Sequence, residues 1–225
     1  MTATSIDIPG AARRMGASAP PAWGAVSAMT LCVAVLIASE FMPVSLLTPI
    51  AQDLGLTEGQ AGQAISISGL FAVVSSLLIR TVVGPLDRRI VLVALALLLA
   101  VSGTLVALAP NFLVMMAGRA LLGIAIGGFW SPNTAVIMRL LPVAAVPLGL
   151  AVTNGGNALA STVSAPLGSY MGELIGWRGA FFAVVPLALA AAVWQATTLP
   201  RLPTVDGRRA TAAVGFGPPL TSRRC

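Results

Sequence analysis

Two ionisable residues of opposite sign, Glu40 and Arg119, lie well inside long apolar stretches of the sequence. A charged side chain in hydrocarbon costs at least about 2.5–3.5 kcal/mol on insertion scales, so such residues usually face a partner or a water-filled cavity. A carboxylate held there can gain and lose a proton, because desolvation favours its neutral form and a nearby guanidinium favours its ionised form. The pair therefore indicates a polar pathway through a membrane.

The elements that must position this pair are apolar helices. The chain is 57% hydrophobic and 9% charged, with a mean hydropathy of +0.93, whereas soluble domains are roughly a quarter charged. Each apolar segment has about the 20 residues that a helix needs to cross hydrocarbon, and no strand-like alternation is present. We expect an all-α integral membrane protein, a bundle of six transmembrane helices at Trp23–Leu47, Ala61–Ile79, Ile90–Leu108, Phe112–Met138, Val146–Leu167 and Gly179–Leu199.

Positive charge predicts the orientation of these segments. All 13 positive charges are arginines, and 11 of them lie before the first segment or directly after the second, fourth or sixth segment. The two exceptions are Arg119 and Arg178. The positive-inside rule places the arginine-rich connections and tails, and with them both termini, in the cytoplasm. We expect residues 1–22 to form a cytoplasmic tail, 23–199 the bundle, and 200–225 a cytoplasmic linker or tail.

This topology places Glu40 and Arg119 at one depth. Glu40 precedes the expected outer end at Leu47 by about seven residues, and Arg119 follows Phe112 by about seven, so both lie roughly 10 Å below the outer surface. A contact near 4 Å would contribute about 4 kcal/mol at an effective dielectric of about 20, before desolvation. We expect either a proton-coupling pair, in which protonation of Glu40 competes with Arg119 or with substrate, or a static structural ion pair.

Two further stripes suggest a cavity wall. Trp130 shares a helical face with Arg119, and Gly123 and Gly127 lie between them, so a nucleobase could stack on the indole while the glycines leave room. The same glycines could instead permit close helix packing, with Trp130 as core. In the fifth segment a polar face offers amide and hydroxyl groups to a ligand, or to interhelical hydrogen bonds, through Asn154, Asn157, Ser161 and Ser164.

Composition argues against several other functions. Without histidine or lysine the chain lacks Ser/His and Ser/Lys hydrolase chemistry and the phosphate-loop lysine of ATP-driven transport. Cys32 and Cys225 predict neither a metal site nor a disulfide framework. No basic stripe interleaved with aromatic residues indicates nucleic-acid binding. We therefore expect neither an enzyme nor a resident cofactor or metal.

Several separated motifs resemble the major facilitator superfamily. The segment Gly84–Arg89 looks like its signature loop between helices two and three, and Arg119–Gly123 resembles its buried-arginine motif. Ala165–Gly168, which contains Pro166, resembles the helix-five motif of its proton-coupled drug antiporters. Further segments, Glu40–Pro49, Gly172–Arg178 and Gly127–Trp130, look like those of bacterial purine ribonucleoside efflux pumps.

The resemblance implies a 3+3 inverted repeat with helices one and four beside a central cavity, in a bacterial inner membrane. It also implies proton-coupled efflux of small organic solutes, including purine ribonucleosides, by alternating access, so the expected partners are lipid, substrate and protons, and not nucleic acid. Gly84, Asp87, Arg88 and Arg89 would form a cytoplasmic gate, although a solvated charge run is the alternative at these positions.

Two features depart from the family pattern. The signature loop lacks its second glycine and a further basic residue. Family members also have twelve helices, whereas this sequence shows six, and Thr204–Cys225 contains no further span. We expect the N-terminal half of the fold, either as a truncated or frameshifted, inactive fragment or as a half-transporter that needs a second six-helix partner.

Overall fold

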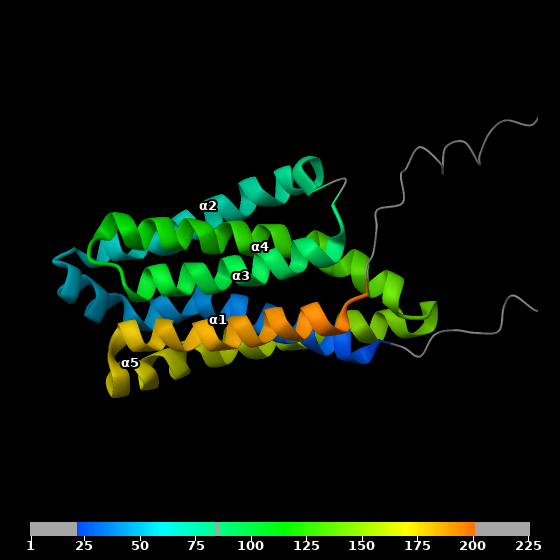
Figure 1. Ribbon diagram of the computed structural model, residues 1–225. Coiled ribbons are helices and arrows are strands. Elements are labelled where there is room, and N and C mark those ends of the chain that lie inside the picture. Colours follow the sequence, from blue (N-terminus) through cyan, green and yellow to red (C-terminus); the bar gives the residue numbers. More distant parts are fainter. Residues whose placement is uncertain (1–21, 84–85, 201–225) are drawn as a thin grey trace, which may run out of the picture.

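The computed structural model describes residues 22–83 and 86–200, and within them the chain is all-helical, as expected. The helices lie along one common direction, with α2, α3 and α4 on one side of the bundle and α1 and α5 on the other (Figure 1). In chain order the elements are α1 Trp23–Leu54, α2 Glu58–Val83, α3 Arg88–Ala107, α4 Phe112–Leu140, the 3-10 turn η2 Val143–Ala145 and α5 Val146–Thr198.

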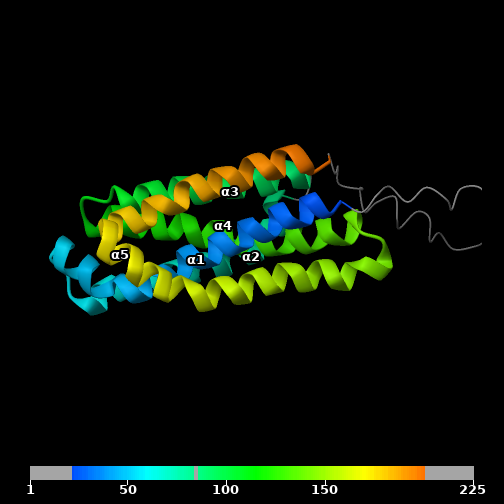
Figure 2. The same cartoon turned by 90° about the horizontal axis from the view of Figure 1, so that it is seen from below.

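The last helix, α5, consists of two limbs. Gly176 has φ 74° and ψ 165°, a backbone conformation outside the helical region that strongly favours glycine. The chain reverses there, so residues 146–175 and 177–198 form two antiparallel limbs, coloured yellow and orange in Figure 2. With α1 to α4 they give the six expected passes within the described residues, and all five helices are long and apolar enough to span a membrane.

Two expected boundaries are wrong. The first helix does not end at Leu47 but continues to Leu54, through Pro43 and Pro49, and ends at Gly55 in the left-handed conformation. The connection between the first and second passes is thus reduced to residues 55–57. Likewise, the fifth pass runs beyond Leu167 to the break at Gly176. Proline is tolerated inside membrane helices when other groups bond the carbonyls that it leaves free.

Side-chain caps fix where three helices begin. At α2, the backbone N–H of Gln60 donates to Thr57 Oγ1 at 3.2 Å and that of Thr57 to Gln60 Oε1 at 3.0 Å, a reciprocal capping box. Asp87 Oδ1 accepts from the Arg89 N–H at 3.0 Å ahead of α3, and Asn111 Oδ1 accepts from the Val114 N–H ahead of α4. These polar turns define two ends of the bundle, the Gly55 end and the Asp87 end.

Glycines bring the helices into close contact. A Cβ atom added to Gly123 would lie 2.2 Å from the Ser68 carbonyl oxygen, and one added to Gly127 would lie 2.0 Å from that of Ala72. The backbones of α2 and α4 therefore touch, as small residues allow in membranes. The first limb of α5 approaches α1 in the same way, because a Cβ on Gly168 would lie 2.7 Å from Ser45 Oγ.

Candidate functional site

Arg119 lies at the junction of α1, α2 and α4, with a side chain that is 1% exposed. Its Nη2 pairs with Glu40 Oε2 at 3.0 Å, the contact that equal depth predicted. Its Nε donates to the Ala64 carbonyl of α2 at 3.0 Å, and its Nη1 to the Ser39 carbonyl of α1 at 2.8 Å. The guanidinium thus joins three helices and keeps partners other than Glu40.

Glu40 is held on both oxygens but is less enclosed, with 16% of its side chain exposed. Oε2 accepts from Arg119, and Oε1 accepts from the Ser68 hydroxyl of α2 at 2.9 Å. Ser68 Oγ also accepts from Arg119 Nη2 at 3.1 Å. The site is therefore a triad of carboxylate, guanidinium and hydroxyl, open to its surroundings mainly on the Glu40 side.

Sequence reasoning missed Ser68, although a signal for part of the site was available. Pro43 lacks an N–H, so the Ser39 carbonyl four residues earlier has no intrahelical donor. That carbonyl is the acceptor of Arg119 Nη1. Pro43 therefore indicated in the sequence that the Ser39 carbonyl would accept a hydrogen bond from another helix. Arg119 is the donor of that bond.

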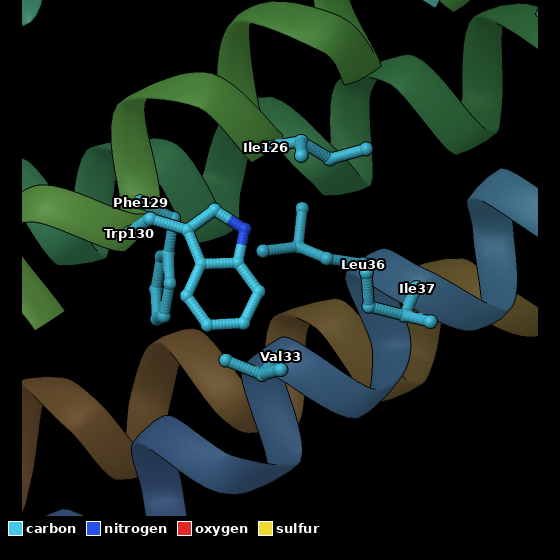
Figure 3. A pocket seen from close by; sticks show the side chains of 6 residues that line it. All are labelled: Val33, Leu36, Ile37, Ile126, Phe129 and Trp130. Carbon is cyan, nitrogen blue, oxygen red and sulfur yellow. The ribbon is translucent and has the colours of Figure 1, made fainter. Parts of the chain in front are cut away.

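Beside the triad, the side chains of α1 and α4 leave a shallow apolar depression that is too narrow to hold even a water molecule. Figure 3 shows the Trp130 indole projecting from α4 toward α1, where it meets Val33 and Leu36. The other lining residues are Ile37, Ile126 and Phe129. On α1 this depression is about one turn from Glu40, and the role of Trp130 in a substrate cavity stays a prediction.

The glycines near Trp130 do not leave room for a ligand. Gly123 and Gly127 are covered by the backbone of α2 at Ser68 and Ala72. The packing interpretation of these residues is therefore confirmed, and the expectation that they widen a cavity beneath Trp130 is wrong.

The polar stripe of helix five does not reach the depression. Asn154 is exposed and donates to the Leu150 carbonyl of its own helix at 3.0 Å, and Ser161 Oγ donates to the Ala158 carbonyl at 2.9 Å. Asn157 is half-buried, whereas Ser164 is buried and donates to the Ser161 carbonyl at 3.4 Å. The bonds of Asn154, Ser161 and Ser164 stay within one helix in the part of the chain that the structure describes.

Three residues of the expected cytoplasmic gate lie at the start of α3, and their role as a gate stays a prediction. Asp87 caps α3 by accepting from the Arg89 N–H, and the Arg89 guanidinium donates to the Ala196 carbonyl of α5. Arg88 is half-buried, and Gly84 lies outside the described residues. In the helix-five motif, Pro166 is exposed, while Gly168 is buried against α1.

Curated relatives and solved structures share this architecture. "Transcription regulatory protein OpdE" of Pseudomonas aeruginosa strain PAO1 is 59% identical over 180 residues, which cover 80% of this chain and 45% of that protein. "Purine ribonucleoside efflux pump NepI" of Salmonella typhimurium strain LT2 is 44% identical over 185 residues, covering 82% of this chain and 47% of the pump. The chain therefore spans about half the length of the curated relatives it matches.

Among solved structures, a bacterial homologue of the human lysosomal transporter Spinster, inward-facing and unoccupied, aligns with a TM-score of 0.74 at 15% identity, covering 84% of this chain and 45% of that one. A D-xylose–proton symporter aligns with a TM-score of 0.72 at 15% identity, covering 87% and 53%. The Major Facilitator Superfamily itself matches residues 29–223. The six passes thus have the fold of an N-terminal transporter half, and the chain belongs to the Major Facilitator Superfamily.

Proposed function

We propose that this chain is the N-terminal half of a proton-coupled efflux transporter that works by alternating access. Membership of a family of secondary transporters supports the general activity. The observation that carries the finer proposal is the Glu40–Arg119 ion pair, deep within the helices and joined to three of them. Intramembrane ionisable pairs of this kind are typical of proton relays.

The coupling follows from what protonation does to the triad. A proton on Glu40 removes its negative charge and ends the ion pair with Arg119, while the bonds from Arg119 to the Ser39 and Ala64 carbonyls remain. The guanidinium stays bonded to both carbonyls, so the change falls on the side-chain contact between Glu40 of α1 and Arg119 of α4. A substrate bound between these helices would compete with the proton for the same site, which is the condition for antiport.

For the substrate we propose small organic solutes with a flat apolar face, with purine ribonucleosides as the first class to test. One support is the Salmonella relative, whose description names that substrate class. Another is the Trp130 indole, which faces α1 (Figure 3) and offers a flat surface on which a base could stack once α1 and α4 move apart during alternating access. The residues that line the depression are apolar, so polar contacts to a ribose would come from beyond it, including the length of the relatives that this chain does not span.

A static ion pair is the alternative for the site. It is favoured by the anchoring of Arg119 to two backbone carbonyls, which would tie three helices together without any proton transfer. For the molecule, the alternatives are an inactive fragment and a half-transporter that needs a second six-helix partner.

Direct DNA binding is not part of our proposal, although the Pseudomonas relative is described as a transcription regulatory protein. Every described helix longer than the three residues of η2 is an apolar span. Such helices lie in the bilayer, where they cannot enter a DNA groove. We therefore place the activity of this chain in the membrane.

The test is a vesicle assay in which the chain alone is compared with the chain joined to the second half of the Salmonella pump. We expect purine nucleoside transport by the joined protein that is driven by an imposed proton gradient, and loss of gradient-driven transport in Glu40→Gln. Glu173→Gln, at an exposed carboxylate of α5, is the matched control and should retain transport.

Each outcome separates the proposals. Proton-driven transport that survives Glu40→Gln would make the ion pair structural. Nucleoside transport by neither protein would contradict the substrate class, and transport by the joined protein alone would support a half that needs its partner.

A further inference from the structure

The helix α3 and the second limb of α5, residues 177–198, pack directly against each other. A Cβ atom added to Gly103 of α3 would lie 3.3 Å from Val185 Cγ2 and 3.6 Å from the Phe181 carbonyl oxygen. The two helices run antiparallel, because the start of each lies beside the end of the other, as the two contacts below show.

At the Gly55 end, Arg178 reaches from the start of the second limb to the end of α3. Its Nη2 donates to the Ala109 carbonyl at 2.8 Å, just beyond the last helical residue, Ala107. The guanidinium also pairs with Asp53 of α1 and lies 4.3 Å from the centre of the Trp177 ring. Three contacts therefore fix the direction in which this side chain points.

At the Asp87 end, Arg89 makes the converse contact, from the start of α3 to the end of the second limb. Its Nη2 donates to the Ala196 carbonyl. In a helix that carbonyl would accept from the residue four positions later, which is Pro200 and has no N–H. The Ala196 carbonyl therefore has no helical N–H donor and can accept from Arg89. Asp87 accepts from the Arg89 N–H and so fixes the start of α3 next to this carbonyl.

We propose that Arg89 and Arg178 form a reciprocal clasp that fixes the register of α3 along the second limb of α5. Each arginine is the second residue of its helix and binds a carbonyl at the end of the other, where a cation is also favoured by the helix dipole. The contacts are separated by about 18–20 residues, or roughly 30 Å, so they lie at opposite ends of the helix pair.

A clasp at both ends prevents the sliding of one helix past the other. A single contact would leave the far end free to splay, whereas two contacts of opposite direction oppose displacement along either axis. The pair α3 and 177–198 would then be a rigid support against which α1 and α4 pack, the helices that carry Glu40 and Arg119. This inference does not depend on the transported substrate or on proton coupling.

The test is hydrogen exchange measured on the full 225-residue chain in lipid nanodiscs. We expect Arg89→Gln to speed amide exchange in residues 193–199 by about tenfold, as the loss of a charged hydrogen bond allows, and to leave residues 103–109 unchanged. Arg178→Gln should do the opposite, so each variant is the control for the other. Lysine variants, which keep the charge, should show smaller effects at the same ends.

The location of the effect decides the proposal. Unchanged exchange in both variants, or equal increases at both ends in either one, would overturn it. If a glutamine variant does not fold, the lysine variants give the same localised comparison, and the absence of a local effect there would overturn it as well.

Discussion

At the scale of single residues, one missing N–H organises the site. Pro43 leaves the Ser39 carbonyl without a helical donor, and Arg119 donates to it. The charge of this guanidinium is neutralised by Glu40, the residue that follows Ser39. A buried charge is thus stabilised by backbone acceptors as well as by its counter-ion. Equal depth along oppositely running helices indicated that Glu40 and Arg119 could meet if α1 and α4 were neighbours, although Leu47, from which the depth of Glu40 was counted, is not the end of α1.

Ser68 gives a test of the triad. Ser68→Ala removes the donor to Glu40 Oε1 and an acceptor of Arg119, so we expect a loss of about 1–2 kcal/mol in stability. The measurement is the thermal unfolding midpoint in detergent, which should fall. Ser76→Ala is the control, since that exposed hydroxyl bonds only the Val73 carbonyl of its own helix. Equal midpoints for the two variants would contradict the bridging role of Ser68.

The sequence could not reveal Ser68 for a physical reason. A serine in an apolar helix usually bonds a carbonyl of its own helix, and the Ile65 carbonyl, 2.8 Å from Ser68 Oγ, is an alternative acceptor for the one proton of this hydroxyl. Only the approach of α2 to α1 and α4 adds Glu40 and Arg119 as partners. The wrong expectation for the glycines below Trp130 has the same origin, since spacing along one helix does not identify its neighbour.

At the scale of elements, the contact between α2 and α4 depends on the absence of side chains. Gly123 and Gly127 lie one turn apart and let the α2 backbone approach to within van der Waals contact. Apolar composition and segment length located all six passes, whereas the ends of α1 and of the fifth pass were misplaced. Both helices run on past a proline, Pro49 in α1 and Pro166 in the fifth pass, because in a membrane helix other groups can bond the carbonyls that proline leaves free.

Gly127→Ala tests this contact. The added Cβ would lie 2.0 Å from the Ala72 carbonyl oxygen, a backbone atom that cannot move alone, so α2 and α4 must separate. We expect a loss of about 1–3 kcal/mol, as for overpacked cores, seen as a lower unfolding midpoint.

The control for that variant is Gly155→Ala, because a Cβ there meets no atom within 4 Å. It should be neutral or slightly stabilising, since alanine is the better helix former. A Gly127→Ala protein as stable as Gly155→Ala would show that the two backbones are not pressed together.

At the scale of the whole molecule, the arginine distribution predicts that the Asp87 end faces the cytoplasm and the Gly55 end faces the outside. Single cysteines test this in a Cys225→Ser background, where the remaining Cys32 is buried. A membrane-impermeant maleimide applied to spheroplasts should label Gly59→Cys, and should label Leu86→Cys only after lysis. The reverse pattern would invert the predicted orientation.

The reversal at Gly176 also affects how the chain enters the membrane during synthesis. Because a single residue separates the two limbs of α5, almost no polar chain has to be translocated between them. The limbs can therefore insert together as one hairpin, driven by their combined apolar surface. In the predicted orientation Arg178 crosses the membrane with the apex. Its partner Asp53 lies on α1, a helix made earlier, so the carboxylate is in place before the arginine is synthesised.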